Sequence, residues 1–305
     1  MTNAKTAGRQ LRRWRVRAGM VAAAVLLSLG AVPAAATPDG GDPLPASGTL
    51  EPALDCRPET EQPNPVVILG GFGAVGDIRA TLDKQMAGIT GGIRDLGGCP
   101  FIFGYGIIGP MQAAAPVAES AGQLRDFVAK VLATTKAERV DIVAHSSGAL
   151  IANYYLKFLH GGASVDRAVY LAPVTKGTTA ATLIGGLDLP GSPEGLAGVL
   201  NDVTNPLRDS VFRGVQGALD CLAGSKVTTE LLSGGITVPG VTYSVLATRG
   251  DQVLTPPGAA SFIDEPGVTN DYFEDLYPRA GLASHAALPM QPDAARWVVE
   301  QLLTE

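Results

Sequence analysis

Ser146 has the sequence surroundings of a catalytic nucleophile. It is the central serine of an Ala-His-Ser-Ser-Gly segment that follows a run rich in β-branched residues at 139–143 and precedes a helix-like segment at 149–156. A strand, a small-x-Ser-x-small turn and a helix in this order predict a nucleophile elbow. Such a tight turn exposes the serine hydroxyl and needs small residues on both sides, here Ala144 and Gly148. Because similar pentapeptides also occur by chance, the assignment depends on a base and an acid elsewhere.

The base must come from the three histidines of the chain. His145 neighbours Ser146 in the elbow, where its side chain cannot turn back to the serine. His160 follows the predicted helix, about 20 Å from Ser146 at a rise of 1.5 Å per residue. His285 lies in a loop just before the last predicted helix. In enzymes with this elbow the base comes last in the order Ser, Asp or Glu, His, so we predict His285 as the base, although a lone loop histidine is more often simply solvated.

The acid of the expected triad is Asp251. It follows the predicted strand at 241–246 by a few residues, and a carboxylate just past the carboxyl end of a core strand points into the site. It also precedes His285, as the chain order requires. Other carboxylates before His285 lie further from a recognisable strand end, namely Asp264, Glu265, Asp271, Glu274 and Asp275.

An oxyanion hole requires two backbone N–H donors. We expect one from Ser147, directly after the nucleophile, and one from Phe72 in the Gly-Gly-Phe-Gly loop after the first predicted strand. Glycines there let the backbone approach a substrate closely. A phosphate-binding loop is the weaker alternative, because neither G-x-G-x-x-G at a helix start nor a following Gly-Lys-Ser/Thr is present. No Cys/His cluster has metal-ligand spacing, so neither a metal nor a cofactor is expected.

The elements that must position these residues alternate between strands and helices. Apolar and β-branched runs predict strands, and apolar residues at helical spacing predict helices. The alternation predicts an α/β fold with a mainly parallel central sheet and helices on both faces. The predicted strands are 65–69, 101–103, 139–143, 167–171 and 241–246, and the predicted helices are 78–96, 116–137, 149–156 and 293–303.

Residues 178–240 interrupt this alternation. The segment is rich in Gly and Pro, with helical patches near 194–203 and 206–222. A stretch this long without a strand is usually functional or inserted, so we expect it to form a cap over the site within one α/β domain spanning 65–305; a floppy surface excursion is the alternative.

The N-terminal 36 residues have the pattern of an export signal. Six basic residues precede an apolar run at 18–32, and three alanines at 34–36 supply a cleavage site. An uncleaved anchor is the alternative, although the run is short for a membrane span. Removal near Ala36 leaves a Pro- and Gly-rich arm at 37–64 and 17 basic against 29 acidic residues, a net charge of −12. Nucleic acid is therefore a poor partner, and no stable protein partner is predicted.

Three cysteines in an exported chain indicate one disulfide and one odd thiol. Cys56 precedes the first core strand and Cys99 precedes the second. If those strands are neighbours, Cys56 and Cys99 form the natural pair and Cys221 is left over. Three unpaired, buried cysteines remain the alternative.

With these residues placed, the chain resembles the secreted bacterial class 2 (EstA-like) triacylglycerol lipases and, more distantly, the fungal lipase known as lipase B. The resemblance covers most of 52–303. It implies an α/β-hydrolase fold and hydrolysis of lipid esters, with Ser146 as nucleophile, Asp251 as acid and His285 as base, and it supports the Cys56–Cys99 disulfide. The segments that carry it are 140–146, 153–159, 171–173, 177–179 and 247–251.

Three departures from the family pattern leave substrate preference open. Gly70-Gly71 stands where the family has His-Gly, and Ser147 stands where Gln is typical. Cys221 lacks the further cysteines that family members often carry. Two other functions also remain open on the sequence: an acyltransferase of the cell envelope with the same triad, and a binding module with a vestigial site.

Overall fold

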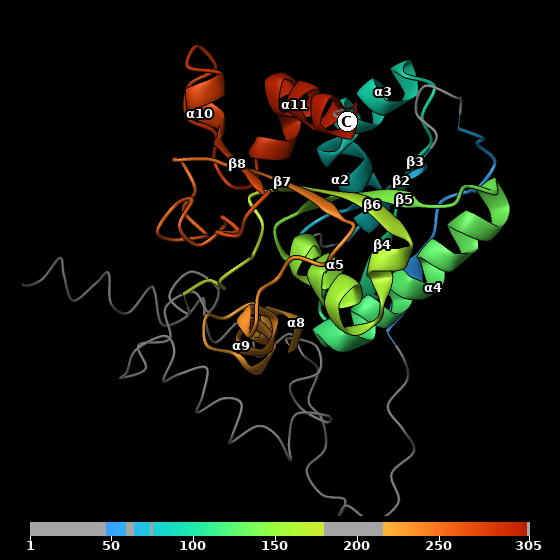
Figure 1. Ribbon diagram of the computed structural model, residues 1–305, viewed down its shortest axis with the longest axis horizontal. Coiled ribbons are helices and arrows are strands. Elements are labelled where there is room, and N and C mark those ends of the chain that lie inside the picture. The colour runs from blue at the N-terminus through green and yellow to red at the C-terminus, as the bar shows by residue number, and fades with distance from the viewer. Residues whose placement is uncertain (1–46, 59–63, 74–75, 180–215, 304–305) are drawn as a thin grey trace, which may run out of the picture.

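The computed structural model describes residues 47–58, 64–73, 76–179 and 216–303 (Figure 1). Within these ranges six strands form one parallel sheet in the order β3-β2-β5-β6-β7-β8, and β1 pairs with β4 in an antiparallel ribbon. The strands are β1 (Gly48–Leu50), β2 (Val66–Leu69), β3 (Pro100–Ile102), β4 (Gly104–Ile107), β5 (Val140–His145), β6 (Val165–Leu171), β7 (Thr242–Ala247) and β8 (Thr269–Tyr272).

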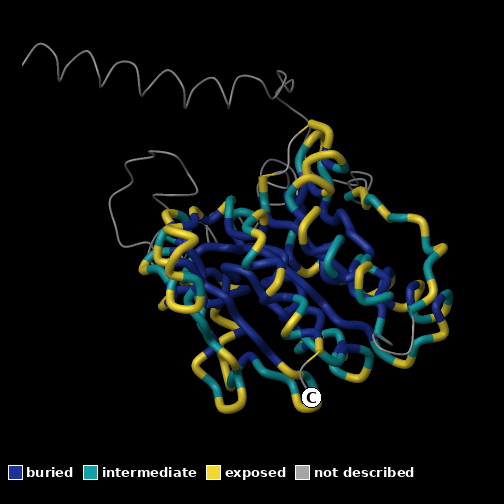
Figure 2. The backbone as a smooth tube through the Cα atoms, turned by 90° about the horizontal axis from the view of Figure 1, so that it is seen from above, coloured by how far each residue is buried: buried dark blue, intermediate teal, exposed yellow. Residues whose placement is uncertain are grey.

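Helices cover both faces of this sheet (Figure 1). Helices α2, α3 and α11 lie on one face, whereas α4 and α5 lie on the other, and the strands β2, β5, β6 and β7 between them are largely buried (Figure 2). The helices are α2 (Ile78–Gln85), α3 (Ala87–Asp95), α4 (Val117–Thr135), α5 (Ser147–Phe158), α8 (Gln216–Asp220), α9 (Lys226–Leu232), α10 (Phe273–Leu276) and α11 (Pro292–Leu303), with 3-10 turns η1 (Gly161–Ala163) and η3 (Leu288–Met290).

The predicted α/β architecture is confirmed, with differences at single elements. The helix predicted over 78–96 is two helices that meet at Met86, whose backbone leaves helical geometry. Strand β8 and the β1–β4 ribbon are absent from the sequence prediction. In the ranges that the structure describes, no helix has the length and apolar character needed to span a membrane.

The described part of the predicted N-terminal arm packs against the domain. Strand β1 pairs with β4, and Ser47 donates hydrogen bonds to Glu119 on α4. Cys56 and Cys99 form a disulfide, and Cys221 is free and buried. Strands β2 and β3 are neighbours, as the expected pairing of the cysteines assumes. The predicted signal peptide lies outside the described residues.

The predicted cap is described only at its two ends, because residues 180–215 lie outside the described ranges. The helical patch predicted at 194–203 is therefore not described, and that at 206–222 is described from Gln216 onward, where α8 lies. Asp220 at the end of α8 accepts the Val117 N–H at 2.9 Å and so caps α4. Thr178 and Leu222 form a β-bridge, which joins the two described ends of the insertion.

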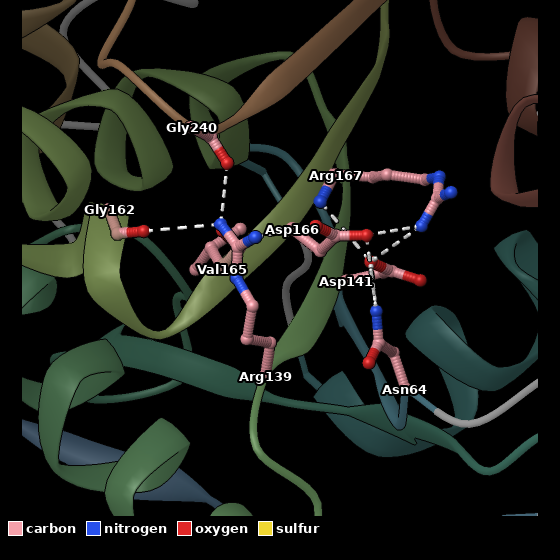
Figure 3. A network of polar contacts seen from close by, with 8 residues as sticks. All are labelled: Asn64, Arg139, Asp141, Gly162, Val165, Asp166, Arg167 and Gly240. Carbon is pink, nitrogen blue, oxygen red and sulfur yellow. Dashed lines mark hydrogen bonds and ion pairs between the residues drawn. The ribbon is translucent and has the colours of Figure 1, made fainter. Parts of the chain in front are cut away.

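Charged side chains gather at the edge of the sheet where the strands begin (Figure 3). Asn64 donates to Asp141 at 3.1 Å, and the Arg167 N–H donates to the same carboxylate at 3.2 Å. Arg139 donates to Asp166 and to the carbonyls of Gly162, Val165 and Gly240. This group, the amino-edge network, ties together the starts of β5, β6 and β7.

Candidate active site

Ser146 occupies a sharp turn between β5 and α5. Its backbone has φ 56° and ψ −125°, a sparsely populated conformation for a residue other than glycine. The surroundings hold it there: its N–H donates to the Leu171 carbonyl, and its own carbonyl accepts the N–H groups of Ala149 and Val174, all at 3.1 Å. The residue is 8% exposed, and His285 and the loop after β2 lie against it.

The small residues around Ser146 have a steric reason. A Cβ on Gly148 would lie 2.8 Å from the Gly70 carbonyl oxygen and 3.0 Å from the Leu69 Cβ. Ala144 is fully buried on β5 between neighbouring strands. Larger side chains at either position would push the elbow away from β2, so the small-x-Ser-x-small pattern follows from the close approach of β2 to the turn.

The structure brings Ser146, His285 and Asp251 together from three separate parts of the chain. His285 Nε2 lies 2.9 Å from Ser146 Oγ, and His285 Nδ1 lies 2.8 Å from Asp251 Oδ2. Ser146 follows β5, Asp251 follows β7, and His285 lies in the segment before α11. All three residues are at least nine-tenths buried. This arrangement allows proton transfer from the serine to the histidine.

The environment of Asp251 favours its charged form. Its Oδ1 accepts the N–H groups of Val253 and Leu254, both at 2.8 Å, and Oδ2 faces His285. Burial alone raises the pKa of Asp251, but the hydrogen bonds and the charge of His285 outweigh burial and lower it. A carboxylate here requires the His285 proton on Nδ1. Nε2 then has the lone pair that accepts the Ser146 hydroxyl proton.

The glycine loop after β2 lies directly beside Ser146. A Cβ on Gly71 would lie 2.8 Å from the Ser146 Cβ and 3.3 Å from its Oγ, so only glycine allows this approach. Phe72 comes next and packs partly buried against the core, while Ser147 is the first residue of α5. These are the two residues from which the sequence predicts oxyanion donors.

Two buried side chains that the sequence analysis does not identify hold this loop. The Tyr105 hydroxyl donates to the Gly70 carbonyl at 2.6 Å, and Gln112 Nε2 donates to the Gly71 carbonyl at 3.2 Å. Both donors are fully buried. Because they fix two successive carbonyls, they fix the direction of the peptide N–H groups between and after them. Neither residue belongs to a local motif that could have identified it.

The remaining acidic candidates from the sequence have other partners. Glu274, for example, accepts the Thr248 hydroxyl and the Arg249 N–H, 2.5 and 2.9 Å away. Among the acidic candidates in the described part of the chain, only Asp251 makes a hydrogen bond to His285. The other partners are Lys176 for Asp264, Thr237 for Glu265, Trp297 for Asp271 and Arg249 for Asp275. No group of His, Cys, Asp and Glu in the described ranges could hold a metal ion.

Known proteins are similar to this chain in sequence and in fold. A model of the class 2 lipase family matches residues 103–199 of the chain. The structure is similar to Aspergillus fumigatus lipase B, with a TM-score of 0.61 and 14% sequence identity over 84% of this chain; the match spans 56% of the fungal chain.

Two prokaryotic structures are similar over their whole length. The mature form of a Bacillus licheniformis lipase has a TM-score of 0.53 and 12% identity, over 86% of this chain and 100% of its own. A Paleococcus ferrophilus monoacylglycerol lipase has a TM-score of 0.51 and 16% identity, over 83% of this chain and 98% of its own. At these identities the structural similarity shows a shared α/β-hydrolase fold.

Proposed function

We propose that this chain is a serine hydrolase acting on acyl glycerols or related lipid esters, because a class 2 lipase family model matches residues 103–199 and the chain shares the α/β-hydrolase fold of known lipases. The observation that carries the proposal is the hydrogen-bonded chain from Ser146 through His285 to Asp251. The Tyr105 and Gln112 contacts, which hold the loop beside the serine, give it further support.

The proposed reaction has two halves. Ser146 Oγ attacks the ester carbonyl while His285 Nε2 takes its proton, and Asp251 stabilises the imidazolium that forms. The N–H groups of Phe72 and Ser147 bind the oxyanion of the tetrahedral intermediate. His285 then protonates the leaving alcohol, which leaves an acyl group on Ser146. A water molecule, deprotonated by His285, attacks the acyl carbonyl; the bond from the acyl carbon to Ser146 Oγ then breaks, His285 returns the proton to Ser146 Oγ, and the carboxylic acid is released.

We propose export as the setting of this activity, with the signal peptide removed near Ala36 and the product secreted or retained at the cell envelope. The Cys56–Cys99 disulfide supports this setting, since structural disulfides persist in oxidising compartments. The names of the relatives, a lipase B and a monoacylglycerol lipase among them, support a lipid ester as the substrate. The segment 178–240 is proposed as a cap over the site.

The decisive experiment measures hydrolysis of a chain-length series of p-nitrophenyl esters by the wild type and by Ser146→Ala. We expect turnover by the wild type and a loss of several orders of magnitude in kcat for the variant. A fluorophosphonate probe should label Ser146 in the wild type and nothing in the variant. Wild-type rates in Ser146→Ala, or labelling of another residue, would contradict the proposal.

Preference for aggregated substrate is tested with the same esters above and below their solubility limit. A lipase should gain activity when a long-chain ester passes its solubility limit, whereas an esterase should follow the concentration of dissolved substrate. Addition of alcohol acceptors to the assay separates hydrolysis from acyl transfer, because a transferase would give mainly the new ester.

A further inference from the structure

The backbone of His285 is held by the side chains that neighbour the other two triad members. His145, immediately before Ser146, has its Nε2 3.0 Å from the His285 carbonyl oxygen. Gln252, immediately after Asp251, has its Oε1 3.4 Å from the His285 N–H. His285 therefore has four hydrogen-bonding contacts to the elbow and the acid loop, two through its ring and two through its peptide groups.

His145 is well suited to anchor another residue. It is the last residue of β5, is 3% exposed and is fixed by pairing with Leu171 on β6. Burial, together with the neighbouring His285, lowers the pKa of His145 to about 3, so the ring is neutral and carries a single proton. Since a carbonyl can only accept, that proton is on Nε2.

The other ring nitrogen of His145 has no competing role in the described part of the chain. Its Nδ1 is buried and makes no hydrogen bond there, and it lies 3.3 Å from the position that a Cβ on Gly71 would occupy. This nitrogen therefore lies against the glycine loop. The one hydrogen bond that His145 makes through its ring is therefore the bond to the His285 carbonyl.

His285 needs such an anchor because its own segment is irregular. Residues 281–284 have no regular secondary structure, and Leu282 is 73% exposed. By contrast, Gln252 is exposed and its contact is long, so it contributes less. A general base must be held within a few tenths of an ångström, and a displacement of about 1 Å can cost ~100-fold in rate.

We propose that His145 is a positioning residue, which holds the proposed base at Ser146 by donating a hydrogen bond to the His285 carbonyl. The elbow thereby carries the nucleophile and also the anchor for the base in two successive residues. This inference rests on the proposed hydrolase function, because it assigns His145 a part in setting the rate of that reaction. The hydrogen bond between His145 and the His285 carbonyl does not depend on which ester is the substrate.

The test compares His145→Met with His145→Gln, two unbranched side chains of similar size of which only Gln carries an N–H donor near the Nε2 position. We expect His145→Met to lower kcat about 10- to 100-fold with KM within about threefold of the wild type. His145→Gln should recover most of the lost kcat. A merely structural role would lower the thermal stability of both variants and would not separate their kcat values. Equal kcat values in the two folded variants, or a wild-type value for His145→Met, would overturn the inference.

A second readout does not need turnover. The N–H groups of Ala287 and Leu288 both donate to the Ser284 carbonyl at 3.0 Å, so their hydrogen exchange reports opening of the segment around His285. Exchange there should be faster in His145→Met than in His145→Gln, and unchanged in Ser146→Ala. If the wild type hydrolyses no ester but this exchange difference appears, the hydrolase proposal fails and the anchor stands. If the wild type hydrolyses esters and the exchange difference is absent, the anchor fails and the hydrolase proposal stands.

Discussion

The parallel strands begin at one edge of the sheet, the amino edge, and end at the other, the carboxyl edge, and each edge contains a buried carboxylate. The pKa values of these two carboxylates are shifted in opposite directions. Asp141 lies near the start of β5 and is fully buried, and Asp251 follows β7 and is 5% exposed. Burial raises the pKa of Asp141 to about 7, whereas the pKa of Asp251 lies below its ordinary value. Strand β5 connects both edges, because it begins at the amino-edge network (Figure 3) and ends at His145, directly before Ser146.

The difference in pKa has two causes, because the two carboxylates differ both in their burial and in their hydrogen-bond donors. Asp251 receives two backbone N–H groups on one oxygen and the His285 ring on the other, all at 2.8 Å. Asp141 receives longer bonds of 3.1 and 3.2 Å, and the Arg167 guanidinium lies 4.0 Å from it while also pairing with Asp166. Burial therefore dominates at Asp141, whereas at Asp251 the hydrogen bonds and the charge of His285 together outweigh burial. Of the two buried carboxylates, Asp251 is the one whose surroundings favour the charged form, as the proposed triad requires, whereas Asp141 takes part in the bonds that brace the strands.

The largest expected contrast comes from the same substitution at both edges. Asp251→Asn should lower kcat by about 10³- to 10⁴-fold, because an amide neither favours the His285 tautomer with its proton on Nδ1 nor stabilises the imidazolium. Asp141→Asn is the matched control and should leave kcat within about twofold. Steady-state kinetics on a soluble p-nitrophenyl ester measures both. A large loss in Asp141→Asn would mean that the amino edge is coupled to catalysis.

The next contrast concerns the glycines. In Gly71→Ala the new Cβ would lie 2.8 Å from the Ser146 Cβ, so we expect the loop to retreat and kcat/KM to fall about 10- to 100-fold. Gly122→Ala on α4 is the control, because its Cβ would meet no atom within 4 Å. That variant should keep its activity and gain about 0.5–1 kcal/mol in free energy of unfolding from the higher helix propensity of alanine. Unchanged kinetics in Gly71→Ala would show that the loop tolerates displacement.

The two edges also differ in what the sequence predicts. At the carboxyl edge the sequence predicts the three residues that the structure brings into hydrogen-bond distance, because the elbow motif is local and only three histidines compete. It does not predict Tyr105 or Gln112, whose bonds span 35 and 41 residues and leave no pattern in the sequence. His145 could have been singled out from the sequence, because it adjoins Ser146. Its proposed role could not, because that role depends on the position of the His285 carbonyl in the fold.

At the amino edge the sequence does not predict the network of polar contacts, since charged residues at strand starts usually face water.

The secondary-structure elements that the sequence does not predict also depend on contacts between distant parts of the chain. Strand β8 is polar, with the sequence Thr-Asn-Asp-Tyr, and pairs on one side only at the sheet edge, so no apolar run marks it. The break at Met86 lets α3 pack on α11, where Gly88 faces Ala295 and Gly92 faces Val299. Such long-range packing overrides the continuous helical pattern of 78–96.

The raised pKa of Asp141 predicts a pH dependence of stability. Between about pH 4, where an unfolded aspartate titrates, and pH 7 the folded chain keeps a proton that the unfolded chain releases. The free energy of unfolding contributed by this residue therefore falls as the pH rises through that range, by about 2–3 kcal/mol from pH 5 to pH 8. Asp141→Asn keeps an acceptor for Asn64 and for the Arg167 N–H but lacks the proton, so the stability of wild type relative to variant should be greater at pH 5. Urea unfolding at both pH values measures the difference, and equal differences would contradict the assignment.

The smallest effect is expected at Arg139, which joins three parts of the chain without reaching the site. Its guanidinium contacts Asp166 at 2.6 Å and donates to the carbonyl oxygens of Gly162 and Gly240. Arg139→Met keeps much of the aliphatic side chain but removes these bonds, so the free energy of unfolding should fall by about 1–2 kcal/mol with kcat unchanged. Arg139→Lys should recover part of this loss, since one ammonium cannot reach all the acceptors that the planar guanidinium reaches. Chemical denaturation and kinetics on the same samples test both statements. A loss of kcat without a loss of stability would show that the brace at the amino edge also sets the geometry at Ser146.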